Sequence, residues 1–357
     1  MDKRIVCAMA VTTFIAAGCA EKIDDGTYDN DIRYLNAWLK QDHEELGITI
    51  DRNPETNMPD TLGRGVYLLS ETEGTGVKAS KGDYVRIRFV KTGLSGTVNA
   101  SSEESIARQL GTYDRTYYYG PRTFSLTAGT NTAGFIDGIK GMKEGGKRNI
   151  LIPEWLDSTE DYSTEAEFLE KSTSSDHYIY TINLEKVIKD FDQYRKDEIE
   201  AFLKDKVYGK LQYDDGTYVT DVKAVEEGFY FIPVSDTTGH RTFPSDTTVY
   251  INYVGSRLDG QAFDTTVEKV ALDNWIWSSS KTYEKTKITW GASAGEIKMD
   301  GSSVISGFSK TLWQMNRGTG IGIFWSDLGY GSSSSGNRIP AYAPLMFKVE
   351  FVDEEEE

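Results

Sequence analysis

The chain contains two copies of one pattern, and this internal repeat constrains the fold more than any other feature. Tyr34–Lys40 (YLNAWLK) is matched in the second half by Glu198–Lys204 (EIEAFLK), and both have apolar residues at helical spacing. Val85–Phe89 (VRIRF) and Val249–Tyr253 (VYINY) are related by the same sequence offset, and both alternate with the period of two that marks a half-buried strand. Each half is therefore predicted to place a helix before a set of strands.

A second pair of segments completes the repeat. In Gly134–Gly145 and again in Gly307–Gly318, an aromatic, an aliphatic and a Met side chain recur on one face of a short helix. Alternating strands then close the two halves at Tyr178–Leu184 and Leu345–Val352. The pattern predicts an α+β fold in duplicate, with an antiparallel sheet wrapped on one short helix in each half and a further helix before each half.

Composition excludes several classes of function. The 357 residues carry a net charge of −17, which argues against binding nucleic-acid phosphates. Both cysteines, Cys7 and Cys19, lie near the N-terminus, so the body of the chain has no disulfide framework and no cysteine metal site. The three histidines are far apart in the sequence. We therefore expect no metal and no cofactor.

The N-terminus has the organisation of a signal peptide. Lys3 and Arg4 precede an apolar stretch from Ile5 to Ala17, which is shorter than the roughly 20 residues that a membrane-spanning helix needs. The following Gly18-Cys19 completes a sequence that resembles a bacterial lipobox. This resemblance implies removal of residues 1–18, acylation of Cys19, and a lipid-anchored location in the cell envelope, in the periplasm or outer membrane. The alternative is an ordinary signal peptide with an incidental Cys.

The repeat and the composition shifts divide the chain into five parts. Helices are predicted over 31–46 and 190–211. The predicted parts are a signal peptide (1–18), a tether and helix (19–61), a first domain (62–189), a linker helix (190–224) and a second domain (225–357).

The second half contains a series of motifs in a fixed order. They are Tyr253, Phe263-Asp264, Val304-Ile305-Ser-Gly-Phe308, Leu328-Gly-Tyr330-Gly and Ile339-Pro340, which leads to Phe347. In this order and spacing they resemble the FKBP-type peptidyl-prolyl cis/trans isomerase family over about residues 225–354. The resemblance implies that the second half is an FKBP-type domain and that the chain has two such domains in tandem.

The same resemblance implies a site and an activity. Asp264 and Tyr330 would be the catalytic pair, with the flap Tyr donating to a substrate carbonyl and the Asp near the twisting amide. The substrate-binding residues would be Tyr253, Phe263, Val304, Ile305, Phe308, Ile339 and Phe347. Proline-containing polypeptides, in particular exported ones, would be the partners. The residue types suit this chemistry, because a twisting amide needs no nucleophile, only a pocket that prefers the twisted form to the planar one.

Several positions depart from the family pattern. Phe308 stands where the family has Trp, Gly329 replaces an Ala, and residues 267–296, with Trp275, Trp277 and Trp290, suggest an insertion. In the first half, Phe89 replaces the pocket Tyr and Asn99-Ala100 replace Phe-Asp. We therefore expect isomerase activity in the second half alone.

A second class of function stays open at this point. Aromatic residues on helices and strands are usually core, and the chain could be a binding or structural lipoprotein that keeps the fold without the activity. Tyr117–Pro121 (YYYGP) could stack on sugar or peptide, although a strand and turn is the simpler interpretation. Gly318–Gly322 follows a predicted helix and enters a strand, which is the reverse of a phosphate-binding loop.

Overall fold

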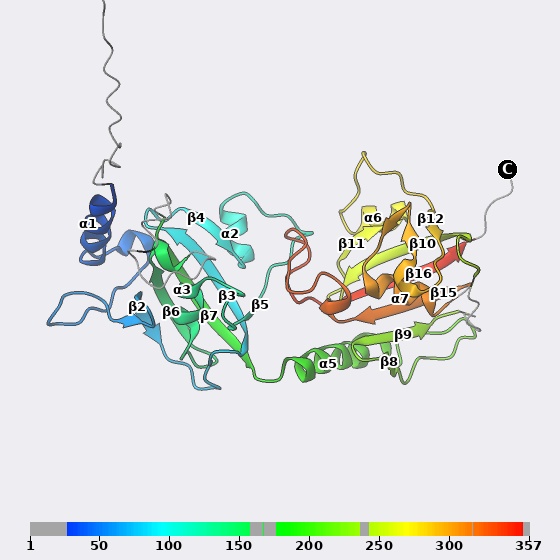
Figure 1. Cartoon of the computed structure of the whole chain (residues 1–357), viewed down its shortest axis with the longest axis horizontal. Coiled ribbons are helices and arrows are strands. Elements are labelled where there is room, and N and C mark those ends of the chain that lie inside the picture. The colour runs from blue at the N-terminus through cyan, green and yellow to red at the C-terminus, as the bar shows by residue number, and fades with distance from the viewer. Residues whose placement is uncertain (1–26, 158–166, 168–175, 236–242, 316, 353–357) are drawn as a thin grey trace, which may run out of the picture. The chain divides into compact units, whose positions relative to one another are not determined.

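The computed structural model describes residues 27–157, 167, 176–235, 243–315 and 317–352 (Figure 1). The predicted signal peptide and the lipidation site Cys19 lie outside the described residues, so both stay predictions. The chain divides into two compact units, Met1–Asp42 and His43–Glu357. None of the described helices has the length and apolar character needed to cross a bilayer.

The first unit contains helix α1 (Thr27–Leu39). Its buried side chains Leu35, Trp38 and Leu39 follow the i, i+3, i+4 spacing of one helix face. Because α1 ends at Leu39, the predicted helix over 31–46 is wrong at its C-terminal end. His43 has non-helical backbone dihedrals, with φ −125° and ψ 53°. Glu44–Leu46 form a separate 3-10 turn, η1, that ends at a left-handed Gly47 with φ 67°.

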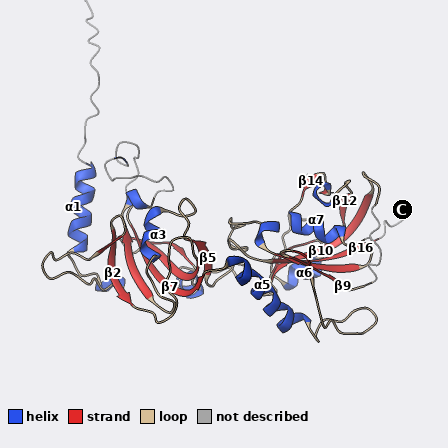
Figure 2. Ribbon diagram, turned by 60° about the horizontal axis from the view of Figure 1, so that its bottom comes forward, coloured by secondary structure: helices blue, strands red, loops and turns tan. Residues whose placement is uncertain are grey.

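The second unit contains two antiparallel sheets (Figures 1 and 2). In the first sheet the strand order is β1-β2-β6-β7-β3-β4, and β5 also pairs with β3. Its strands are β1 (Thr61–Leu62), β2 (Val66–Thr72), β3 (Tyr84–Gly93), β4 (Val98–Ser101), β5 (Arg122–Ser125), β6 (Lys147–Ile152) and β7 (Tyr178–Ile188). We call residues 61–188 the first domain.

The second sheet has the order β14-β13-β12-β10-β16-β15-β9-β8, and β11 also pairs with β10. Its strands are β8 (Ala224–Glu226), β9 (Phe229–Pro233), β10 (Thr248–Arg257), β11 (Ala262–Thr265), β12 (Thr286–Thr289), β13 (Lys298–Met299), β14 (Ser302–Ser303), β15 (Thr319–Phe324) and β16 (Leu345–Val352). We call residues 224–352 the second domain.

One short helix packs on each sheet. Helix α3 (Ala133–Ile139) contacts β2 and β6, and helix α7 (Ser306–Trp313) contacts β15 and β16 (Figure 1). The approach of α7 requires Gly307, because a Cβ there would lie 2.3 Å from the ring of Phe324. Further helical segments in the described residues are α2 (Glu104–Gln109), η2 (Glu154–Leu156), α5 (Phe191–Phe202), α6 (Glu268–Asp273), η4 (Ala294–Glu296) and η5 (Ser326–Leu328).

The predicted duplicated α+β fold is confirmed. The path β2-β6-β7-β3 of the first sheet has the same order and direction as β9-β15-β16-β10 of the second. The registers match as well, since Val90 pairs with Ser101 and Val254 pairs with Thr265 at the equivalent positions of the repeat.

The segment 267–296 that suggests an insertion is mostly common to both domains. Helices α2 and α6 begin at equivalent positions of the repeat, and so do β5 and β12. The extra residues of the second domain lie between β12 and α7, where they form η4 and the hairpin β13-β14. Trp290 is buried here and stacks on Trp313 at 5.5 Å, whereas Trp275 and Trp277 are exposed.

The predicted linker helix is present with a change near its end. Asp190 caps α5 by accepting from the Gln193 backbone N–H at 2.9 Å. A single π-helical turn, η3 (Leu203–Val207), follows α5 directly, so the helix ends at Val207 and not at 211.

Candidate functional site

The polar part of the predicted site lies where β10 meets β11. Gly255 pairs with Asp264 across the two strands. The Tyr253 hydroxyl donates to Asp264 Oδ2 at 2.6 Å, and Lys281 Nζ forms an ion pair with Asp264 Oδ1. A further hydrogen bond stabilises the pairing of β10 with β11 beside this contact, since the Tyr253 backbone N–H donates to Thr266 Oγ1 at 2.9 Å. The Asp264 carboxylate is therefore oriented by both neighbours while it stays half-exposed.

Four aromatic side chains pack together beside this hydrogen bond, and Tyr253 belongs to both groups. The Phe308 ring lies 5.4 Å from Tyr253 and 5.1 Å from Phe347, and both pairs are edge-to-face. Phe263 contacts Phe347 at 5.7 Å with the same geometry. Such edge-to-face pairs stabilise a cluster beyond the area that they bury. The aromatic cluster formed by Tyr253, Phe263, Phe308 and Phe347 is thus one packed unit drawn from β10, β11, α7 and β16.

A glycine leaves room for two of these rings. A Cβ on Gly255 would lie 2.8 Å from Phe347 and 2.9 Å from Phe263. Contacts below 3.0 Å force neighbouring atoms to move, so no larger residue fits without displacing the rings. Gly255 was not among the residues that the sequence singled out.

The predicted flap residues lie in the loop between η5 and β16. Tyr330 is 37% exposed, and its pKa is raised by burial and by the charge of Asp264. Ile339, from the same loop, is buried in the second-domain core, and Val304 and Ile305 are half-buried against that core at the start of α7. The structure thus brings all the predicted catalytic and substrate-binding residues to one domain.

The surroundings of Tyr253 keep its hydroxyl protonated. Burial, the Asp264 charge and the hydrogen bond to Asp264 raise the pKa of Tyr253 far above its usual value. The hydroxyl therefore remains a donor at any physiological pH. No cluster of three or more His, Cys, Asp or Glu that could hold a metal ion is present in the described part of the chain.

The equivalent place in the first domain has a different chemistry. The Phe89 backbone N–H donates to Ser102 Oγ at 2.9 Å, just as Tyr253 does to Thr266, so the two strand pairs share one register. At these positions, however, Phe89 has no hydroxyl and Ala100 has no carboxylate. The first domain lacks both partners of the Tyr253–Asp264 hydrogen bond.

The first domain has a lysine, Lys91, at the position where the second domain has Gly255. Lys91 pairs with Ala100 across the strands, as Gly255 pairs with Asp264. Its ammonium lies 2.7 Å from Asp157 Oδ2 and 3.7 Å from the centre of the Tyr178 ring. The difference between Lys91 and Gly255 at equivalent positions of the repeat can be read in the sequence, but only the structure shows the ion pair of Lys91 with Asp157.

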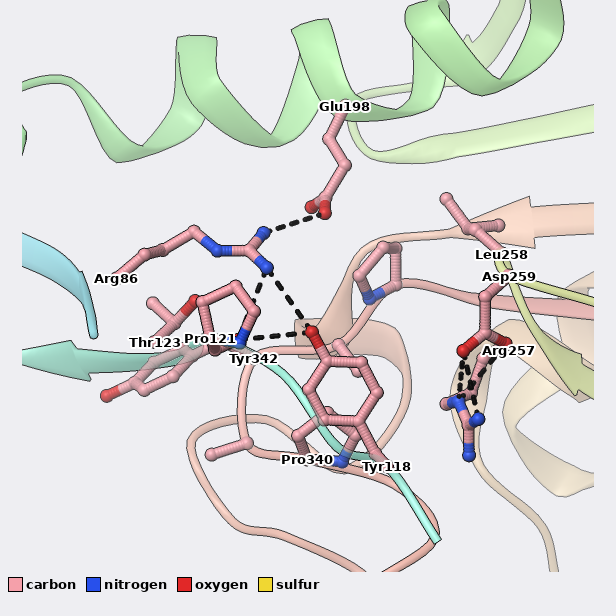
Figure 3. Close-up of a pocket in the computed structure, with 13 residues that line it drawn as sticks. Arg86, Tyr118, Pro121, Thr123, Glu198, Arg257, Leu258, Asp259, Pro340 and Tyr342 are labelled. Carbon is pink, nitrogen blue, oxygen red and sulfur yellow. Dashed lines mark hydrogen bonds and ion pairs between the residues drawn. The ribbon is translucent and has the colours of Figure 1, made fainter. Parts of the chain in front are cut away.

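A separate pocket lies among Arg86, Tyr118, Glu198 and the Pro340–Pro344 segment (Figure 3). Its volume is about 180 Å³, and it contains none of the predicted site residues. Arg86 donates to the Tyr118 hydroxyl at 3.3 Å and forms an ion pair with Glu198 at 3.3 Å. Burial raises the pKa of Glu198. Arg86, Tyr118 and Glu198 are thus already paired with one another, and we assign their contacts a structural role beside α5.

Comparison with known proteins identifies the family. The family model for FKBP-type peptidyl-prolyl cis-trans isomerases matches residues 76–185 and 239–352. The two matches together cover more than half of the chain, and one lies within each of the two domains. The chain belongs to this family and carries two FKBP-type domains in tandem.

No curated protein sequence matches this chain. Among solved structures, the three FKBP domains of wheat FKBP73 are 13% identical, with a TM-score of 0.26 over 80% of this chain and 92% of that one. Escherichia coli FkpA is 17% identical, with a TM-score of 0.28 over 45% and 59%. A peptidyl-prolyl cis-trans isomerase from Pseudomonas syringae is 20% identical, with a TM-score of 0.29 over 45% and 93%. Because these scores are low, the family assignment depends on the sequence match.

Proposed function

We propose that the second domain is a peptidyl-prolyl cis/trans isomerase that acts on proline-containing segments of exported polypeptides. The observation that carries this proposal is the Tyr253–Asp264 hydrogen bond at 2.6 Å, set beside the aromatic cluster. The first domain has the same backbone but neither of these side chains.

The proposed chemistry is stabilisation of a twisted amide. An X–Pro bond isomerises in tens to hundreds of seconds without help, because amide resonance creates a barrier of roughly 18–20 kcal/mol. The twisted amide has lost this conjugation and is less polar at oxygen. Aromatic edges that contact the proline ring would therefore favour the twisted form over the planar one. Asp264 and Tyr330 would provide the polar contacts that orient the peptide.

The first domain would not isomerise. It lacks the hydroxyl and the carboxylate, and the Lys91–Asp157 ion pair occupies the space beside β3 and β4. Its role would be structural or in binding.

We further propose a location in the cell envelope, with the mature chain attached to a membrane through acylated Cys19. Support comes from the sequence alone, in the basic start, the apolar stretch and the lipobox-like residues before Cys19.

An NMR exchange measurement on a proline-containing tetrapeptide tests the activity with the full chain. We expect the wild-type chain to accelerate cis/trans exchange and Asp264→Asn to reduce the acceleration about two- to twelve-fold, as the loss of one hydrogen-bonding partner predicts. Asp273→Asn is the matched control, because Asp273 lies on α6 in the same domain and pairs with the exposed Lys269. Equal activity of all three proteins would contradict the assignment of the site.

The alternative is an FKBP-like binding protein without catalysis. Two observations favour it, namely the ion pair of Asp264 with Lys281 and the presence of Phe308 where the family has Trp. Peptide binding to the second domain without any acceleration of exchange would identify this alternative.

A further inference from the structure

The first domain has a pocket of its own, with a volume of about 340 Å³, between β4, α2 and the loop before β5. This size is within the usual range of about 300–1,000 Å³ for small-molecule sites. Residues that characterise its wall are Asn99, Ala100, Ile106, Leu110, Tyr117 and Arg122. None of them takes part in the proposed isomerase site.

The unusual member of this pocket is Arg122. Its Nε is buried and has no hydrogen-bond partner among the described residues, and within that part of the chain its guanidinium forms no ion pair. The central carbon of its guanidinium lies 5.9 Å from the centre of the Phe89 ring. Glu103 also lines the pocket, but its carboxylate pairs with Arg88 at 3.5 Å. A partly buried cation without a counter-charge is costly, and it is conspicuous in a chain with an excess of acidic residues.

Comparison with the second domain shows that the charge of this region is reversed. The counterparts of Ala100 and Arg122 in the repeat are Asp264 and Thr286. In the second domain the Asp264 carboxylate is neutralised by Lys281, and Thr286 donates to Asp300 at 2.9 Å. In the first domain the carboxylate is missing and an unpaired guanidinium is present. The first domain therefore has a place for an anion that the second domain fills with its own side chain.

The rest of the wall specifies what kind of anion fits. Ile106 and Leu110 supply an apolar side on and after α2, and Leu110 is 52% exposed. Tyr117 adds a half-buried ring and Asn99 a side-chain amide. Asn337 of the second domain also lines the pocket, and its backbone carbonyl accepts from the Tyr118 backbone N–H at 2.8 Å.

We propose that this pocket binds a carboxylate attached to an apolar or aromatic body, with Arg122 as its counter-charge. The planar guanidinium fork matches the two oxygens of a carboxylate. The ring of Tyr117 and the side chains of Ile106 and Leu110 would contact the apolar body. Such a carboxylate could belong to a free organic acid or to the C-terminal residue of a polypeptide. The proposal is independent of isomerase activity.

Calorimetric titration of the full-length protein tests the proposal with N-acetyl-L-phenylalanine and its uncharged amide. We expect the acid to bind and the amide to bind at least about tenfold more weakly, because a charge-assisted contact is lost. Arg122→Gln should weaken binding of the acid by a similar factor, and Arg122→Lys should fall between, since it keeps the charge but not the fork. Arg33→Gln, at an exposed position of α1, is the matched control and should bind like the wild type.

A salt titration of the wild-type protein tests the proposal even if the Arg122 variants misfold. Raising the salt concentration from about 0.05 M to about 0.5 M should weaken binding of the acid but not of the amide, because screening acts on charge. Equal affinities for acid and amide, or no binding of the acid, would overturn the proposal. A peptide ending in a free phenylalanine carboxylate separates the two sources. Tighter binding than the single residue indicates a polypeptide end, and equal binding indicates a free acid.

Discussion

Lys91 in the first domain and Gly255 in the second occupy the same register position, opposite Ala100 and Asp264 respectively. Gly255 leaves space that the rings of Phe263 and Phe347 approach, whereas the Lys91 side chain extends over aromatic rings to reach Asp157. The residue at this position is thus a charged side chain paired with Asp157 in the first domain and a glycine that makes room for two aromatic rings in the second.

Removing the ammonium should destabilise the first domain locally. The Asp157 side chain is 9% exposed and that of Lys91 20%, so Lys91→Met leaves a nearly buried carboxylate without its cation. We expect a loss of about 1–3 kcal/mol, below the roughly 3–5 kcal/mol of a fully buried pair. Hydrogen exchange at the amides of β3 and β7 measures it within this domain, as protection lowered about 5- to 150-fold.

Two further variants make this prediction specific. Lys91→Met combined with Asp157→Asn should recover part of the loss, because no buried charge is then unpaired. Lys196→Met removes a lysine from an exposed pair on α5 and should cost less than about 1 kcal/mol. A Lys91→Met protein with unchanged protection would show that the ion pair contributes nothing.

Filling the space at Gly255 should damage the second site. Gly255→Ala places a methyl group within 3.0 Å of Phe347 and Phe263, and overpacking of this kind costs about 1–3 kcal/mol. We expect a lower melting temperature and a lower kcat/KM on an X–Pro peptide. Gly295→Ala is the control, because a Cβ there meets no atom within 4 Å. If both glycine variants behave alike, the rings beside Gly255 are not part of the substrate site.

Loss of the Tyr253 hydroxyl should reduce activity without unfolding the domain. Tyr253→Phe removes the donor to Asp264 and leaves the ring contacts with Phe308 and Phe347 in place. The expected reduction in kcat/KM is about two- to twelve-fold, from one hydrogen bond of about 0.5–1.5 kcal/mol. Tyr250→Phe, on the same strand, should retain wild-type kinetics. A Tyr253→Phe protein as active as the parent would show that orientation of Asp264 does not matter.

Replacement of Cys19 should release the protein from the membrane. Cys19→Ser removes the thiol that would be acylated, and the lipid on this residue is the anchor that the sequence predicts. Detergent-free fractionation should place Cys19→Ser in the soluble fraction, while Cys7→Ser should remain with the membrane. A membrane-bound Cys19→Ser protein would refute the lipobox interpretation.

The fold could be predicted from the sequence because the patterns that indicate it lie within single strands and helices. Alternation along β3 and β10, and one apolar face on α3 and α7, depend on spacing that can be counted in the chain. The ordered motifs between Tyr253 and Phe347 indicated the FKBP-type family for the second half, and the internal repeat extended it to the first. The end of α1 at Leu39 was missed, because the residues beyond it continue a plausible helical pattern.

What the sequence could not show depends on side chains distant in the chain. Lys91 reaches Asp157 from a different part of the first domain, and no local pattern marks that ion pair. Arg122 is conspicuous only once its surroundings are known to contain no carboxylate for it. Gly255 similarly matters through rings that arrive from β11 and β16.

The sequence offset between the two copies stays constant from β3 and β10 through to β5 and β12. This stretch has the same length in both copies, so the two copies differ here in their side chains and not in the number of residues. Lys91, Asn99 and Ala100 therefore differ from Gly255, Phe263 and Asp264 as single residues at equivalent backbone positions. At each of these three positions, the residue of one copy can be exchanged for its counterpart in the other without altering the length of the chain.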